Sequence, residues 1–220
     1  MPCKMRCVYF FIFMSFFLKE AQAKANTLSD SWVKVKEKDG VQIFTQHVPG
    51  NPLVAIKGEG LIAAPMEKVL AVLLDIPNTP QWIEYLAEAK IIKYNSPTDF
   101  FSYARFASPV FFVKDREFIT HNLISYKHAE KSVYIEVVSS HESVSTKTQA
   151  LRGTIMMSSM QLKSLNPQQT ELCTILHADP KGMLPKWLVN FFIENVPLRS
   201  FTALRGRLQK VGEVKSPFAL

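Results

Sequence analysis

Few residues of this chain have the types and spacing that covalent catalysis or metal binding requires. Cys173 and His177 share one face of a strand-like segment, but four strand residues separate them by about 13 Å, which excludes a nucleophile–base pair. The sequence contains no G-x-S-x-G, H-E-x-x-H or paired C-x-x-C motif and no glycine-rich phosphate loop. His121, His128 and His141 do not repeat a common metal-ligand spacing. We therefore expect no metal, no cofactor and no enzyme activity from these residues.

The composition is that of a folded, moderately basic chain. Of its 220 residues, 47% are hydrophobic and 20% are charged, which supports a substantial core and excludes general disorder. The formal net charge of +7 permits an anionic partner. Because the basic residues are scattered and do not alternate with aromatic ones along a stripe, we do not expect nucleic acid as a partner.

The first 23 residues have the pattern of a secretory signal peptide. Basic residues precede an apolar run at 7–18, which is too short to span a bilayer comfortably. Cleavage sites follow as A-Q-A at 21–23 or A-K-A at 23–25. We expect export to the periplasm or the extracellular space, with an uncleaved membrane anchor as the alternative. Cleavage would leave Cys173 alone, so the folded domain would contain no internal disulfide.

Alternation of apolar and polar residues predicts a sheet. In residues 32–38, Val33 and Val35 alternate with lysines, and Asp39-Gly40 then predicts a hairpin, since both central turn residues need a positive φ. Further strands are predicted over residues 41–48, 54–62, 89–94, 100–106, 118–126, 133–138, 146–162 (one strand or two) and 171–177. No strand–helix–strand alternation occurs, so the predicted sheet is antiparallel.

Helices are predicted at three places. Two short helices cover residues 66–74 and 78–85, and a long one covers 185–209, where Pro197 should kink or break it. The long helix begins with an apolar stripe of Leu184, Trp187, Leu188, Phe191 and Phe192. A helix lying along a concave sheet leaves an internal space, lined here by aromatic residues and methionines. The predicted fold class is therefore α+β.

Three segments resemble the START lipid-transfer domain family. They are Trp32 with Asp39-Gly40-Val41, then Asp115-Arg116-Glu117-Phe118-Ile119, then Asp179-Pro180-Lys181-Gly182-Met183-Leu184-Pro185-Lys186-Trp187-Leu188-Val189-Asn190. The resemblance implies a helix-grip fold (START or birch-pollen-allergen-like), with a curved antiparallel sheet around the C-terminal helix and one lipid inside. It implies binding or carriage of that lipid without chemistry. We assign residues 24–29 to a short linker, 30–212 to this domain and 213–220 to a tail.

The resemblance also implies where the polar end of a ligand would lie. The sterol-binding branch has an acidic–arginine pair, which would fall near Tyr103 or Ala104 and at Asn122, and these positions carry no charge. In the phospholipid-binding branch, the arginine corresponding to Arg116 is implicated in holding a phosphate. The planar guanidinium matches two phosphate oxygens at once. The alternative is a structural ion pair between Arg116 and a nearby carboxylate, such as that of Glu117.

Further residues are weaker lipid-binding candidates. Arg152 would lie at the polar end or be a solvated strand residue, and His177 would contact the ligand or be a satisfied buried histidine. The lipid-binding candidates are Arg116, Tyr103, Arg152, His177, Trp187, Leu188, Phe191 and Phe192.

The function expected from these features is non-enzymatic binding of a single lipid, phospholipid-like in preference to sterol, with transfer as a further step. A helix-grip enzyme or cofactor-handling protein acting on an aromatic or isoprenoid substrate is the alternative, and an accessory protein whose pocket is filled by its own side chains is a third. We expect a monomer that contacts a membrane surface transiently. The basic residues of the last helix could make that contact; they are Arg199, Arg205, Arg207, Lys210 and Lys215.

Overall fold

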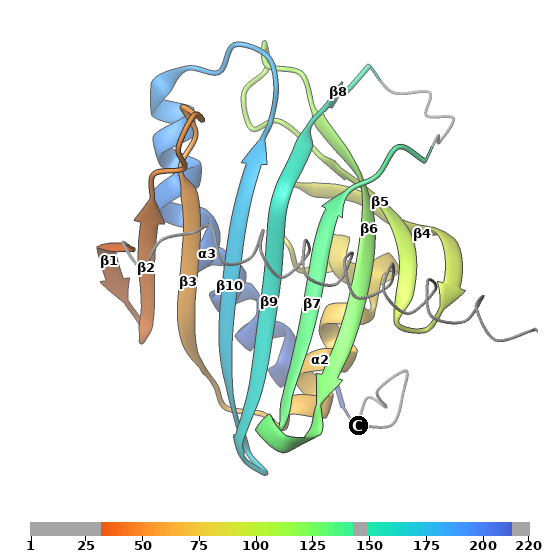
Figure 1. The fold of residues 1–220 in the computed structure, drawn as a ribbon. Helices are drawn as coiled ribbons and strands as arrows, with labels where there is room; N and C mark the ends of the chain where they lie inside the picture. The colour runs from red at the N-terminus through yellow and green to blue at the C-terminus, as the bar shows by residue number, and fades with distance from the viewer. Residues whose placement is uncertain (1–31, 143–148, 213–220) are drawn as a thin grey trace, which may run out of the picture. The chain divides into compact units, whose positions relative to one another are not determined.

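The alternating segments build one ten-stranded sheet in the order β1-β2-β3-β10-β9-β7-β6-β5-β4, with β8 beside β6 (Figure 1). The computed structural model describes residues 32–142 and 149–212, and for residues 186, 187 and 190–194 it describes the backbone alone. The strands are β1 (Val33–Lys38), β2 (Val41–Gln46), β3 (Ala55–Ile62), β4 (Leu86–Ser96), β5 (Asp99–Phe106), β6 (Arg116–Lys127), β7 (Ser132–Ser139), β8 (Leu151–Arg152), β9 (Thr154–Asn166) and β10 (Gln169–Asp179). Neighbouring strands are antiparallel, as predicted, except that the two-residue β8 runs parallel to β6.

The predicted hairpin at Asp39-Gly40 is confirmed. Both residues have a positive φ, 53° and 69°, and β1 pairs with β2 on either side of them. The twist of such a turn matches that of the strands, so this dipeptide fixes the first pairing of the sheet locally.

The second short helix differs from its prediction. Residues 78–85 were expected to form it, but the structure contains a 3-10 helix, η1, at Ile76–Gln81. Pro77 and Pro80 both lack the N–H that an α-helix would use, so the wider helix cannot propagate through this segment. Tyr85, at φ 63°, lies in the left-handed region before β4 begins. The first short helix, α2 (Met66–Leu74), has the predicted bounds.

The long helix α3 (Lys186–Lys210) is within one residue of its predicted bounds, and Pro197 does not break it. Pro197 is buried against β3, where a Cβ added to Gly58 would lie 2.9 Å from the proline Cβ. The missing side chain at Gly58 therefore leaves room for the proline-bearing turn to pack directly on the strand.

The core lies between one face of the sheet, the inner face, and the helices α2 and α3, which both lie on that side (Figure 1). The inner face presents alternate residues of each strand, as the period-two pattern requires. Buried members of this core are Val41, Ile43, Ile62, Val133, Ile135 and Leu162 from the strands, Met66, Val69 and Leu70 from α2, and Phe201, Leu204 and Leu208 from α3.

Some sequence-based predictions lie outside the described residues. These are the signal peptide (1–23), the linker (24–29) and the tail (213–220). Among the residues that are described, no helix has both the length and the apolar character needed to cross a membrane.

Candidate functional site

A pocket of about 370 Å³ opens where the C-terminal end of α2 meets β4 and β5. It is lined by Leu74, Ile91, Tyr94, Ser96, Pro97 and Phe100. Leu74 ends α2, and Phe100 and Tyr94 pair across the β4–β5 ladder, so helix and sheet each supply an apolar wall. The volume is at the low end of the roughly 300–1,000 Å³ that is usual for small-molecule sites.

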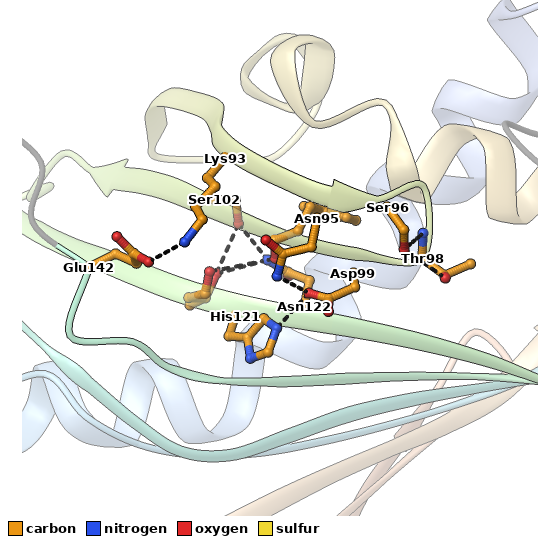
Figure 2. Close-up of polar contacts among 11 residues, drawn as sticks. Lys93, Asn95, Ser96, Thr98, Asp99, Ser102, His121, Asn122 and Glu142 are labelled. Carbon is orange, nitrogen blue, oxygen red and sulfur yellow. Dashed lines mark hydrogen bonds and ion pairs between the residues drawn. The ribbon is translucent and has the colours of Figure 1, made fainter.

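Three neutral polar side chains lie beside this pocket on the inner face. They are Ser102, Thr120 and Asn122, which we call the polar triad; each is at least nine-tenths buried. The Asn122 Nδ2 donates to Ser102 Oγ at 2.9 Å, and the Ser102 and Thr120 hydroxyls are also 2.9 Å apart (Figure 2). Strand register places the triad next to the pocket wall, because Ser102 pairs with Ile91 and Asn122 with Phe100.

The orientation of the Asn122 amide follows from its partners. Nδ2 lies 3.2 Å from the Phe100 carbonyl oxygen and 3.3 Å from that of Thr120. Carbonyl oxygens only accept hydrogen bonds, so the nitrogen must be the atom on that side. The Asn122 Oδ1 accepts no hydrogen bond from the described residues, which leaves an acceptor for a donor group on a ligand.

Arg116 begins β6 on the same inner face as Thr120 and Asn122, as the unbroken register between β5 and β6 requires. Its guanidinium donates to three backbone carbonyls: Nε to Pro180 at 3.1 Å, Nη2 to Lys181 at 3.1 Å, and Nη1 to Lys114. The residue is only 9% exposed. Burial lowers the pKa of Arg116, and the charge of Asp115 offsets this only in part.

The carboxylates beside Arg116 are paired with other cations. Asp115 accepts a hydrogen bond from Arg105 Nη1 at 2.7 Å, and Glu117 accepts one from Arg152 Nη2 at 2.7 Å. Among the described residues, no carboxylate oxygen lies within ion-pair distance of Arg116. The structural ion pair considered from the sequence is thus replaced by a clamp on main-chain oxygens. Of the five N–H groups of the guanidinium, three have these partners.

Tyr103 and Arg152 meet on the opposite, outer face, where both bind Glu117. The Tyr103 hydroxyl donates to Glu117 Oε2 at 3.1 Å, and Arg152 donates twice to Oε1. Tyr103 is fully buried, whereas the Arg152 side chain is 43% exposed. The structure therefore brings these two candidates together, but not with Arg116. Sequence reasoning missed Glu117 as their shared partner; the acidic residue directly after Arg116 was the available signal.

The remaining candidates are placed as follows. His177 is 5% exposed, and its Nε2 lies 3.2 Å from the Leu53 carbonyl oxygen, to which it must donate. This is the geometry of a satisfied buried histidine. Leu188 is 2% exposed and belongs to the packed part of α3. The side chains of Trp187, Phe191 and Phe192 lie outside the described part of the structure.

Cys173 is the one cysteine in the described ranges, and its environment favours the neutral thiol. Burial and the nearby charge of Glu59 raise its pKa to about 11. A thiol in this state is a poor nucleophile near neutral pH. The described residues also include no cluster of three or more histidine, cysteine or acidic side chains that could hold a metal ion.

A second hollow, of about 570 Å³, lies on the outer face of the sheet, where the stacked rings of Phe101 and His121 form part of its wall. His121 Nε2 is 2.7 Å from Asp99 Oδ1, and Lys93 bridges to Glu142 at 2.8 Å (Figure 2). The hydrogen bond from His121 lowers the pKa of Asp99. These groups pair with one another on the outer face, which is the side of the sheet opposite the inner pocket.

Comparison with known proteins gives consistent matches over most of the chain. The family model of the START domain matches residues 16–214. An uncharacterized protein of Pseudomonas aeruginosa is 25% identical over 185 residues, which covers 84% of this chain and 90% of that protein. Human StAR-related lipid transfer protein 5 superposes with a TM-score of 0.76 at 20% identity, over 90% of this chain and 96% of that one. A STAR-related lipid transfer protein fragment from Xanthomonas axonopodis superposes with a TM-score of 0.71 at 23% identity, over 82% of this chain and 99% of the fragment. At these identities, the two solved structures show a common fold.

Proposed function

Because this chain belongs to the START domain family, we propose that it binds a single lipid between the inner face of the sheet and its helices, without chemistry. The observation that carries the proposal is the apolar pocket between α2 and the β4–β5 hairpin, continuous with the buried core and bordered by the polar triad. Apolar transfer would supply most of the affinity, at roughly 25 cal/mol for each Å² of hydrocarbon removed from water. Polar contacts would then select which lipid binds.

The proposed ligand is phospholipid-like rather than sterol-like. Arg116 supports this preference, because a buried cation without a carboxylate partner is stabilised by an anionic group. Its two remaining N–H groups could bind a phosphate. The inner face offers only neutral groups at Ala104 and Asn122, where the charged pair associated with sterol binding would stand.

Loading would require movement. A lipid with two acyl chains is larger than the pocket of about 370 Å³, so α3 or the loops beside it would have to open, as lids do in other buried sites. We also propose export, a monomeric state and, as a further step, transfer between membranes.

Native mass spectrometry of the protein purified from its natural compartment tests the binding proposal. We expect one co-purified phospholipid for each chain. An empty, closed core would contradict it and favour the accessory role, and a sterol would contradict the preference for phospholipid. Turnover of the bound molecule would favour the enzyme alternative.

Two variants isolate the charge of Arg116. Arg116→Lys and Arg116→Gln both lose the fork that holds the three carbonyls, but only lysine keeps a positive charge. If the charge holds a phosphate, the glutamine variant should retain less phospholipid than the lysine variant, by about 1.5–3 kcal/mol of binding free energy. Equal retention at matched melting temperatures would assign Arg116 a purely structural role.

Export is tested separately, at the N-terminus of the mature protein. Its sequence should begin at Lys24, or at Asn26 if the second site is cleaved. Retention of Met1 on membrane-bound material would contradict the soluble form.

A further inference from the structure

Along the inner face of β5 and β6, four zones of different polarity follow one another. The first is the cation Arg116, at the start of β6. The second is apolar and consists of Phe106, Ala104 and Phe118, all half-buried. The third is the polar triad, and the fourth is the apolar pocket, which begins at Phe100. A ligand lying along these two strands therefore meets charged, apolar, neutral polar and again apolar surface, in that order.

The polar triad contains a buried acceptor that no described residue satisfies. Asn122 is 6% exposed, and four acceptors lie within 3.3 Å of its Nδ2 (Figure 2). The hydroxyls of Ser102 and Thr120 bond to each other, and no described donor reaches Asn122 Oδ1. A buried amide oxygen without a donor is costly, because it has given up its hydrogen bonds to water. A hydroxyl group on a ligand would remove that cost.

Two buried polar side chains elsewhere in the fold have the partner that Asn122 Oδ1 lacks. Thr170, which is fully buried, donates to the Ala64 carbonyl at 2.8 Å, and His177 donates to that of Leu53 at 3.2 Å. Asn122 differs from both in its position, because its strand partner Phe100 lines the pocket. The missing donor can therefore come from a molecule in the pocket.

The spacing of the two polar zones limits where that donor lies on the ligand. Arg116 and Asn122 are six residues apart on β6, which at about 3.3 Å per residue separates them by ~20 Å. One acyl chain spans half of the hydrocarbon core of a bilayer, or roughly 15 Å. With a phosphate at Arg116 and the glycerol unit next to it, Asn122 lies beside the distal half of the chain.

We propose that the preferred ligand is an anionic phospholipid with a hydroxyl group in the distal half of an acyl chain, and that this hydroxyl donates to Asn122 Oδ1. The phosphate binds Arg116, the proximal part of the chain lies on Phe106 and Phe118, and the end of the chain fills the pocket beyond the triad. This inference rests on the proposed function and deepens it by naming the class of lipid. A chain without the hydroxyl leaves the buried oxygen unpaired, which is how polar sites reject ligands that lack a donor.

Competitive binding of three synthetic phosphatidylglycerols tests the proposal. They differ in one chain, which is octadecanoyl, 2-hydroxyoctadecanoyl or 12-hydroxyoctadecanoyl, and each displaces a fluorescent phosphatidylglycerol from the purified protein. We expect the 12-hydroxy lipid to bind about tenfold more tightly than the unsubstituted one, because it adds one hydrogen bond to a buried acceptor. The 2-hydroxy lipid should show no such gain, since its hydroxyl lies near the glycerol unit.

Two variants assign the preference to Asn122. Asn122→Leu removes the acceptor at nearly constant side-chain volume and should abolish the tenfold preference, so that the hydroxylated and unsubstituted lipids bind equally. Ser125→Ala is the matched control and should keep the preference, because Ser125 is exposed on the outer face of the same strand. Melting temperatures show whether each variant is folded.

The outcomes separate this inference from the proposed function. Equal affinity of the wild type for the 12-hydroxy and unsubstituted lipids would overturn the inference and leave phospholipid binding intact. No binding of any of the three lipids would contradict the proposed function itself. Equal binding of the two hydroxyl isomers would overturn the spacing from Arg116, and a preference that persists in folded Asn122→Leu would overturn the role of Asn122. The comparison of lipids uses the wild type, so it decides the question even if Asn122→Leu does not fold.

Discussion

Across β2 and β3, α3 lies directly on the sheet, whereas across β4 and β5 the same inner face borders an open pocket. On the first side, Gly58 and Gly60 leave space that Phe201 fills: a Cβ at Gly60 would lie 2.9 Å from the Phe201 ring. Phe201 is 1% exposed as a result. We call this region the closed half.

The other region, the open half, has no such glycine pair on its inner face. Phe100 and Ile91 project there, with Leu74 of α2 opposite them and the polar triad beside them. In the open half, large and polar side chains keep the sheet and the helices apart. In the closed half, the glycines let the two layers touch. Under the proposed function, the closed half would supply stability and the open half the space for the ligand.

The strongest test of this division is Phe201→Ala. Removing a fully buried ring from the closed half should cost about 3–5 kcal/mol in the free energy of unfolding. Thr202→Ala is the control, because the Thr202 side chain is exposed and bonds only to its own helix, at the Leu198 carbonyl. Urea denaturation measures both; a loss below about 1 kcal/mol for Phe201→Ala would mean that the closed half is not the stabilising region.

Gly60→Ala should cost less, about 1–3 kcal/mol, because the new methyl group must displace the Phe201 ring. Phe201→Leu in the same chain should relieve part of that clash, so the double variant should be more stable than the sum of the two single changes predicts. Strict additivity in chemical denaturation would show that the close approach of α3 at this point is not what limits the substitution.

The reactivity of the Cys173 thiol measures how well the outer side of β10 is shielded from solvent. Its pKa is raised from 9.0 to about 11 by burial and by Glu59, so its thiolate fraction at pH 8 should be about 100-fold lower than that of an unperturbed thiol, with alkylation slowed to a similar degree. The unfolded chain releases this proton first, so stability should fall as pH rises from 9 toward 11 and be unaffected below that window. Alkylation is followed in a chain lacking Cys3 and Cys7, with the urea-unfolded protein as reference; equal rates would contradict the sealed environment.

The smallest effect on stability is expected for Tyr94→Ala in the open half. Tyr94 lines the pocket but is 64% exposed, so its loss should change the free energy of unfolding by less than about 0.5 kcal/mol. Uptake of lipid should change instead, because the mouth of the pocket widens. A melting temperature lowered as far as that of Phe201→Ala would abolish the distinction between the two halves.

Local patterns in the sequence determined most of the secondary structure. Asp39-Gly40 predicted the hairpin between β1 and β2, and Pro65 predicted the start of α2. Both signals act through the backbone of a few neighbouring residues. The alternation of apolar and polar residues predicted the strands, and one long apolar–polar pattern predicted the last helix. The family resemblance then implied how these elements are arranged in space, as a curved antiparallel sheet around the last helix. The second short helix was missed where two prolines lie within one turn.

Only the tertiary structure decided how the site is assembled, because its contacts join residues far apart in the chain. Arg116 could be identified as a candidate from its motif, but its carbonyl partners at Pro180 and Lys181 come from a loop that folding brings back to β6. Tyr103 was one of the lipid-binding candidates, and only the register of β5 with β6, which fixes which alternate residues point inward, shows that it lies on the outer face beside Glu117. The spacing of residues along a strand specifies that neighbouring side chains point to opposite faces of the sheet. Which of the two faces the helices cover depends on which face of the whole sheet buries more apolar surface.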